Sequence, residues 1–180
     1  MRPLGCVTGR FQPVHDQHLE LFELVASECE HLVVAVTNPD SGARRAEPTS
    51  EHRHRPEANP FSYFERVRLL TVALDAAGLG DRTTIVPFDL TRPEVWTQYV
   101  PRHGHQYVRV FSEWERDKAG RLAAAGYEVT VLDGDAATKR HAADVRALLA
   151  SGGDWAGLVP PATVPLLRAL DRLRPAGGPR

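Results

Sequence analysis

The stretch 9-GRFQPVHDQHLELF-22 decides how the chain begins to fold. It follows a short apolar run, Leu4–Thr8, which is typical of a buried strand, and its glycine and proline interrupt that strand. From Asp16 onward the apolar residues recur at helical spacing, and the next apolar run, Leu32–Thr37, again has the length of a strand. A strand, a helix and a strand in this order predict a βαβ unit with a right-handed crossover.

The rest of the chain continues the alternation of helices and strands. Such a pattern predicts an α/β fold, a Rossmann-like doubly wound parallel sheet with helices on both faces. Ligands bind such sheets at the carboxyl ends of the strands, which places the turn at Gly9 on the binding edge. We expect one domain over residues 1–174 and a disordered tail over residues 175–180. The further expected helices are Pro60–Ala77, Glu94–Val100, Glu115–Ala125, Ala142–Ser151 and Val164–Leu173, and the further strands are Thr83–Phe88, Tyr107–Phe111 and Tyr127–Leu132.

Composition excludes several classes of function. A chain of 180 residues with 42% hydrophobic and 25% charged residues is typical of a globular protein. The net charge of -1 gives no support for binding to nucleic acid or to a membrane, so any electropositive site must be local. No apolar run approaches the roughly 20 residues that span a bilayer, and a signal-peptide pattern is missing, so we expect a cytoplasmic protein. Cys6 and Cys29 are expected to be buried free thiols.

Two histidines stand at the start of the first predicted helix. His15 and His18 are at positions i and i+3 and therefore share one face of the first turn. The helix N-terminus directs unpaired N–H groups to the binding edge, which suits phosphate, and Gly9 would let the backbone approach a ligand closely. Two imidazoles there could stabilise charge on a phosphate. Spacing alone favours a plainer alternative, in which one histidine is buried in the core and the other lies on the surface. A zinc site is disfavoured because no third ligand lies nearby in the sequence.

Three motifs carry a resemblance to a known family. The segment 9-GRFQPVHDQH-18 resembles the signature of the HxGH nucleotidylyltransferase superfamily, most closely the archaeal-type nicotinamide mononucleotide adenylyltransferases and the related CTP:phosphonoformate cytidylyltransferases. Downstream, 59-NPFSYFER-66 resembles the NPF…ER element of that family, and 144-DVRALLASGGDWAGLVPPAT-163 resembles its closing (E/D)IR…W…LVP stretch. Three motifs in the same order are more specific than any one of them, and they favour phosphate binding by the two histidines.

The resemblance implies a reaction and a set of residues. A phosphate or phosphonate acceptor attacks the α-phosphorus of a nucleoside triphosphate, either CTP or ATP, and pyrophosphate leaves with the help of Mg²⁺. No metal ligand is predicted from the protein itself. Catalysis is then positioning and charge stabilisation. The implied catalytic residues are His15, His18 and Arg146, and the implied nucleotide- and phosphate-binding residues are Gly9, Arg10, Phe11, Gln12, Lys139, Arg140 and His141.

The sequence departs from the family pattern around the triphosphate. Gln17 stands where HxGH has its glycine, so we expect it to crowd or reshape the nucleotide pocket. In the closing motif, 141-HAADVR-146 stands where the family usually has (S/T)(S/G)TxxR, and the two hydroxyl residues are replaced by His141 and Ala143. The cationic side chains of Lys139, Arg140 and His141 could donate to phosphate instead.

The sequence also departs from the family pattern at the residues implied to bind the acceptor. Trp96 matches a family tryptophan near the nicotinamide, although packing in the core is an equal alternative. The asparagine that often contacts the amide is missing at 92-RPE-94, and 112-SEW-114 replaces the family's SGN. A long loop, Asn38–Ala58, carries many arginines and histidines and is either a solvated surface or a lid over an anion. The residues expected to bind the acceptor are Asn59, Arg66, Trp96, Ser112, Arg44 and Arg45.

These features predict a nucleotidylyltransferase that acts on a small anionic acceptor, and a CTP-dependent phosphonate cytidylyltransferase of natural-product biosynthesis agrees best with the departures. The alternative is a nicotinamide mononucleotide adenylyltransferase, which forms NAD and pyrophosphate from ATP. A third possibility is a nucleotide-binding protein that has lost catalysis. We expect no nucleic-acid or membrane partner, and the resemblance makes a homo-oligomer an option.

Overall fold

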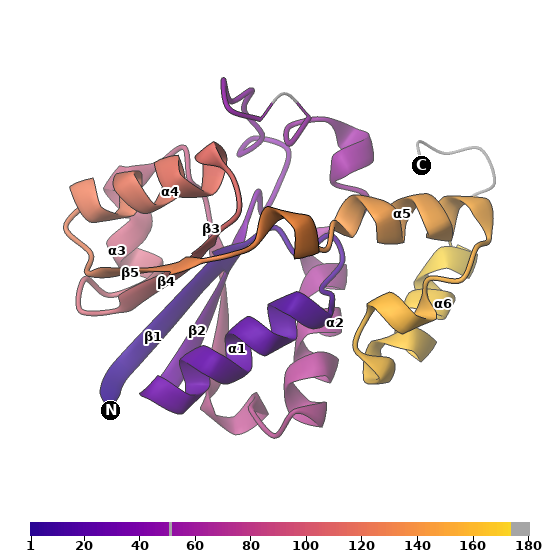
Figure 1. Cartoon of the computed structure of the whole chain (residues 1–180), viewed down its shortest axis with the longest axis horizontal. Coiled ribbons are helices and arrows are strands. Elements are labelled where there is room, and N and C mark those ends of the chain that lie inside the picture. Colours follow the sequence, from indigo (N-terminus) through magenta and orange to yellow (C-terminus); the bar gives the residue numbers. More distant parts are fainter. Residues whose placement is uncertain (51, 174–180) are drawn as a thin grey trace.

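The computed structural model describes residues 1–50 and 52–173, and within them the chain forms a five-stranded parallel sheet (Figure 1). The strand order is β3–β2–β1–β4–β5, so the order reverses between β1 and β4. This is the predicted doubly wound arrangement, and its switch point lies where ligands bind such sheets. The strands are β1 Arg2–Gly9, β2 Cys29–Thr37, β3 Thr83–Phe88, β4 His105–Val110 and β5 Val129–Asp133, and all four neighbouring pairs are parallel.

Helices cover both faces of the sheet. Helices α1 and α2 lie on one face, and α3 and α4 lie on the other, while α5 and α6 extend beyond α2 (Figure 1). None of the helices within residues 1–50 and 52–173 has the length and apolar character needed to cross a membrane. The helices are α1 Asp16–Glu28, α2 Tyr63–Ala76, α3 Trp96–Tyr99, α4 Glu113–Ala124, α5 Ala142–Ser151 and α6 Val164–Leu173.

The predicted elements are present, with shifts of a few residues at their ends. Helix α2 begins at Tyr63 instead of Pro60 because Ser62 forms a capping box with Glu65. The Ser62 hydroxyl accepts a hydrogen bond from the Glu65 amide at 3.2 Å, and the Glu65 carboxylate accepts one from the Ser62 amide at 2.7 Å. The predicted tail, residues 175–180, lies outside the described residues, and the single-domain boundary stays a prediction.

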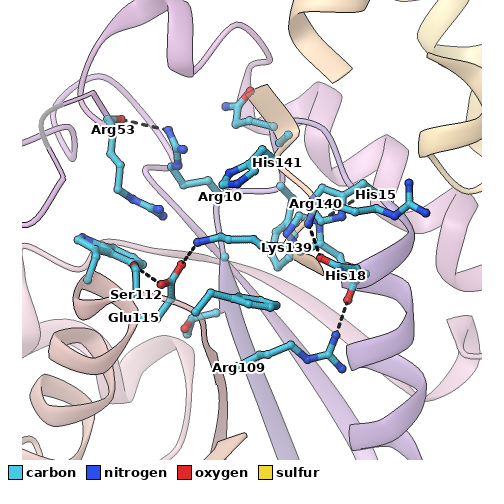
Figure 2. Close-up of a pocket in the computed structure, with 18 of the residues that line it drawn as sticks. Arg10, His15, His18, Arg53, Arg109, Ser112, Glu115, Lys139, Arg140 and His141 are labelled. Atoms are coloured by element: carbon cyan, nitrogen blue, oxygen red, sulfur yellow. Dashed lines mark hydrogen bonds and ion pairs between the residues drawn. The ribbon is translucent and has the colours of Figure 1, made fainter. Parts of the chain in front are cut away.

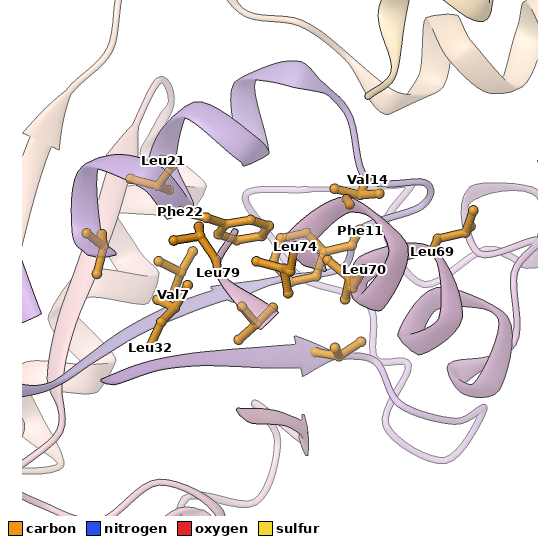
Figure 3. Close-up of a cluster of buried hydrophobic side chains, with 14 of the residues drawn as sticks. Val7, Phe11, Val14, Leu21, Phe22, Leu32, Leu69, Leu70, Leu74 and Leu79 are labelled. Atoms are coloured by element: carbon orange, nitrogen blue, oxygen red, sulfur yellow. The ribbon is translucent and has the colours of Figure 1, made fainter. Parts of the chain in front are cut away.

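The strands separate two hydrophobic clusters, because neighbouring side chains point to opposite faces of the sheet. Val7 and Val34 face the cluster under α1 and α2, which also contains Phe22 and Leu70 (Figure 3). Cys6, Val33 and Trp96 belong to the cluster under α3 and α4. Burial on both faces explains why the strands of the sequence are nearly continuous apolar runs. Cys6 and Cys29 are buried and free, as expected.

Arg66 ties the sheet to α2. Its side chain is 1% exposed, and its guanidinium donates hydrogen bonds to the carbonyl oxygens of Arg10 at 2.9 Å and of Thr37 and Asn38 at 2.8 Å each. Longer bonds reach the carbonyls of Ser62 and Pro39. These acceptors lie at the carboxyl ends of β1 and β2 and at the start of α2. The sequence predicted an acceptor-binding role for Arg66, whereas the structure places this residue in the interior, where it satisfies backbone carbonyls.

Replacement of Arg66 by methionine should lower the free energy of unfolding by about 3 kcal/mol or more, because several buried carbonyls lose their donor. The measurement is urea denaturation monitored by circular dichroism. The control is Arg68→Met, which changes an exposed arginine of the same helix and should alter the free energy of unfolding by about 0.5 kcal/mol or less. Equal effects of the two substitutions would contradict the structural role of Arg66.

Candidate active site

A pocket of about 460 Å³ opens at the carboxyl ends of β1 and β4, where the strand order reverses. Its walls come from five separate parts of the chain: the turn after β1, the first turn of α1, the basic loop after β2, the start of α4 and the segment before α5. Figure 2 shows side chains from these parts converging on one space. Parallel α/β sheets place their ligand sites at this edge.

The pocket brings together most of the predicted site residues. Those that line it are Gly9, Arg10, Phe11, Gln12, His15, His18, Ser112, Lys139, Arg140, His141 and Arg146. Five predicted acceptor-binding residues do not line it, namely Asn59, Arg66, Trp96, Arg44 and Arg45. The indole of Trp96 is 2% exposed, stacks on Phe88 at 5.2 Å and donates a hydrogen bond to the Asp89 carbonyl at 2.7 Å. Trp96 therefore packs in the core, the alternative left open by the sequence.

The turn after β1 is shaped by an aromatic ring. Phe11 has a φ of 50°, in the left-handed region, and its ring lies against Gly9. A Cβ atom at Gly9 would come within 2.7 Å of the Phe11 ring, so only glycine fits there. The sequence suggested that this glycine makes room for a ligand, whereas the structure shows that it makes room for Phe11. The ring also contacts His18 edge-on at 4.9 Å between centroids and thus supports the face of α1 that carries the two histidines.

Gln12 connects two of the sequence motifs. Its buried side chain donates to the Phe61 carbonyl and accepts from the Phe61 amide, both at 2.9 Å. The Gln12 carbonyl in turn accepts a hydrogen bond from Arg146 at 2.8 Å. Asn59 holds the basic loop, because its amide donates to the carbonyls of Arg53 at 2.7 Å and Arg55 at 2.9 Å. The side chains of Gln12 and Asn59 therefore fix the backbone around the pocket.

The two histidines form a stacked pair at the N-terminus of α1, with 3.6 Å between ring centroids. The His15 amide donates to Nδ1 of His18 at 3.2 Å. An amide can only donate, so Nδ1 of His18 is unprotonated, and a neutral His18 carries its proton on Nε2. Burial lowers the pKa of His15 to about 4, with a further contribution from the Arg140 and His141 charges. Burial also holds the pKa of His18 well below its ordinary value.

The pocket carries a large excess of positive charge. Seven arginine and lysine residues line it, against a single acid, Glu115, among the described lining residues. That carboxylate is already engaged, since it accepts hydrogen bonds from Lys139 Nζ at 2.8 Å and from the Ser112 hydroxyl. Burial lowers the pKa of the Arg10 guanidinium, and the charges of Arg53, Arg146 and Arg66 lower it further. A bound polyanion would relieve this repulsion, which makes the pocket suited to phosphates.

Gln17 bridges two walls of the pocket. Its Nε2 donates to the Thr138 carbonyl at 2.7 Å, and its Oε1 accepts from the Arg140 amide at 2.7 Å. The sequence predicted that a glutamine in place of glycine would crowd or reshape the nucleotide pocket. The structure shows that it shapes the pocket by fixing the segment that carries Lys139 and His141 against the start of α1.

Several residues at the pocket were not assigned from the sequence. They are Thr49, Ser50, His52, Arg53, Arg109, Trp114, Glu115 and Lys118. Two signals were available. Arg109 is the single arginine in the otherwise buried strand β4, and its guanidinium reaches the Gln17 carbonyl and Glu20. Trp114 belongs to 112-SEW-114, which departs from the family pattern. Lys118 gave no signal, because a single lysine is ordinary in a helix.

The comparison with protein families agrees with this site. The family model described as cytidylyltransferase-like matches residues 6–155. The chain therefore belongs to the cytidylyltransferase-like family, and it is a nucleotidyltransferase enzyme. It is 36% identical over 165 residues to the phosphonoformate cytidylyltransferase of Streptomyces viridochromogenes, across 91% of this chain and 90% of the relative. It is 31% identical to the nicotinamide-nucleotide adenylyltransferase of Halobacterium salinarum, across 93% of this chain and 86% of the relative. The predicted resemblance is confirmed.

Solved structures share the fold. The bifunctional NMN adenylyltransferase/ADP ribose pyrophosphatase of Francisella tularensis superposes with a TM-score of 0.73 at 14% identity, over 97% of this chain and 51% of that one. The same protein crystallised with AMP and a Mn ion gives a TM-score of 0.70 over 97% and 50% of the two chains. At this identity the likeness confirms the Rossmann-like fold.

Replacement of His15 by asparagine should flatten the pH dependence of stability between about pH 4 and pH 6.5. The unfolded chain protonates His15 below about pH 6.5, whereas the folded chain does so only below about pH 4. Unfolding therefore takes up a proton in this window, and lowering the pH there destabilises the folded state. Urea denaturation across the window should show that wild type loses about 3 kcal/mol more than the variant. Parallel pH profiles would contradict the buried, neutral state of His15.

Replacement of Gln17 by alanine should loosen the segment before α5, because both bridging hydrogen bonds are lost. We expect faster amide hydrogen exchange at residues 138–141 and a rise of about fivefold in KM for the nucleoside triphosphate. The control is Gln98→Ala, which alters an exposed glutamine of α3 outside the pocket lining. If exchange at residues 138–141 matches that of the control, Gln17 does not position this segment.

Proposed function

We propose that the protein transfers a cytidylyl group from CTP to a small phosphonate such as phosphonoformate, with release of pyrophosphate. The observation that carries this proposal is the cationic pocket, which is lined by Arg10, Arg53, Lys118 and Arg146. The one acid among its described lining residues, Glu115, already accepts a hydrogen bond from Lys139. A triphosphate and a compact, highly charged acceptor together match such a surface. The 36% identity to a phosphonoformate cytidylyltransferase along nearly the whole chain supports the same substrate pair.

The chemistry requires positioning more than proton transfer. A phosphonate oxygen of the acceptor attacks the α-phosphorus of CTP, and the new P–O bond forms as the bond to the bridging oxygen of the β-phosphate breaks. The acceptor is already ionised, so no general base is needed. His18 donates from Nε2 and His15 from its ring N–H to phosphate oxygens, while Arg146 and Arg10 hold the charge of the leaving pyrophosphate and of a phosphate near the end of β1.

Mg²⁺ is proposed to enter with the triphosphate. Among the described residues, no group of three or more histidine, cysteine or acidic side chains could hold a metal ion. We therefore derive no step through a metal held by the protein. Magnesium commonly binds substrate phosphates and keeps several of its waters, which suits a site without a protein ligand cage. A fold neighbour crystallised with AMP and a Mn ion supports a divalent cation with the nucleotide.

The second candidate is a nicotinamide mononucleotide adenylyltransferase. Archaeal nicotinamide-nucleotide adenylyltransferases are 28–31% identical to the chain over more than nine tenths of its length, which favours this activity. The core position of Trp96 speaks against it, because this residue was the predicted contact for a nicotinamide ring. The third possibility, a binding protein without catalysis, is disfavoured because His15, His18, Arg10 and Arg146 line one pocket. A cytoplasmic location and a homo-oligomeric state stay predictions.

A panel of acceptors and triphosphates tests the proposed function. With Mg²⁺ present, pyrophosphate release should require CTP and phosphonoformate, and ATP with nicotinamide mononucleotide should give at least tenfold lower kcat/KM. His18→Asn should lower kcat by about 100-fold or more, because a donor to the developing phosphate charge is lost. The control is His103→Asn, which alters an exposed histidine away from the pocket. Preferred turnover of ATP with the mononucleotide would establish the second candidate instead.

A further inference from the structure

The basic loop after β2 is held over the pocket by specific contacts. The Arg53 carbonyl accepts hydrogen bonds from Arg10 at 3.3 Å, from Asn38 at 3.3 Å and from Asn59 at 2.7 Å. Earlier in the loop, Glu47 forms an ion pair with Arg121 of α4. The sequence left open whether this loop is a solvated surface or part of the site. Its backbone is fixed to the motifs around the pocket, and Thr49, Ser50, His52 and Arg53 line the pocket itself.

Arg53 presents its guanidinium to the pocket from a stacked position. The guanidinium carbon lies 3.5 Å from the centroid of the Trp114 ring, which is close for a cation–π contact. Among the described residues, none accepts a hydrogen bond from this guanidinium. The planar group is therefore oriented by the indole and by its own fixed backbone while its N–H donors stay available. Figure 2 shows Arg53 on the opposite side of the pocket from His15 and His18.

Lys118 supplies a second cation at the same end. Its side chain is 8% exposed, and Nζ donates one hydrogen bond, to the Thr8 carbonyl at 2.9 Å. An ammonium has three donors, so two are left for other partners. Nζ also lies 5.5 Å from the centroid of the Trp114 ring. Burial and the nearby Arg53 charge lower the pKa of Lys118 to about 8. The lysine is thus a desolvated cation without an acidic hydrogen-bond partner.

We propose that Arg53 and Lys118, gathered around the indole of Trp114, form the acceptor subsite and select a compact acceptor with several negative charges. This inference rests on the proposed function and names the part of the pocket that binds the acceptor. A phosphonate with an adjoining carboxylate offers the paired oxygens that a planar guanidinium and an ammonium bind. The guanidinium of Arg53 occupies one face of the Trp114 indole, so the aromatic base of a mononucleotide acceptor could not stack on that face.

The test compares Arg53→Met with the wild-type enzyme, with CTP and Mg²⁺ held constant. KM for phosphonoformate should rise about 10- to 100-fold, the effect of one charge-assisted hydrogen bond, while KM for CTP should change less than threefold. The control is Arg55→Met, because Arg55 is an exposed arginine of the same loop that does not line the pocket. Lys118→Met should raise the same KM, and thermal denaturation of each variant shows whether it is folded.

A series of acceptors provides a second readout that a general weakening of the fold would not produce. Wild type should prefer phosphonoformate to methylphosphonate, which lacks the carboxylate, by about tenfold or more in kcat/KM, and Arg53→Met should lose this preference. An unchanged KM and an unchanged preference in folded Arg53→Met would overturn the acceptor subsite alone. Absence of turnover with any phosphonate in the wild-type enzyme would overturn the proposed function, so the two failures are distinguishable.

Discussion

The structure depends on one buried cation that does not touch the pocket. The Arg66 guanidinium collects carbonyl oxygens at the ends of β1 and β2, where the parallel strands leave backbone acceptors without partners. Because Arg66 holds the Arg10 carbonyl, it also fixes the place from which the Arg10 side chain reaches the carbonyls of Arg53 and Ala58. The turn after β1 and the basic loop are therefore positioned by the same residue. Removal of this cation would disturb both walls of the pocket at once.

Two kinds of desolvated cation must be distinguished in this molecule. Arg66 is saturated by carbonyl oxygens, so its charge is offset by backbone dipoles and its role is structural. Arg53 and Lys118 lie at the pocket with donors to spare, and burial lowers the pKa of both groups even though the charge of Glu115 partly offsets it. An anion that enters the pocket removes this unfavourable energy. The number of unsatisfied donors, more than burial or charge alone, separates a structural arginine from a binding one.

Sequence periodicity was sufficient for the sheet, the helices and the place of His15 and His18, because these depend on local spacing and on the edge at which parallel strands end. It was insufficient for Arg66 and Trp96, whose partners lie far away along the chain. A sequence gives the chemical type of these side chains but not the carbonyl or ring that each one meets. The same limit explains why Arg44 and Arg45 were chosen in the basic loop, although Arg53 is the arginine that reaches the pocket.

Two of the departures from the family pattern have a common physical effect. Gln17 stands where the family motif has glycine, and Trp114 stands where it has asparagine, so each adds a large side chain to a wall of the pocket. The Gln17 side chain binds the segment that carries Lys139, and the Trp114 indole stacks against the Arg53 guanidinium. Each substitution therefore fixes cationic side chains at one end of the pocket. Cationic side chains held in this way at both ends of the pocket attract a compact polyanion, so the departures agree with the proposed phosphonate acceptor.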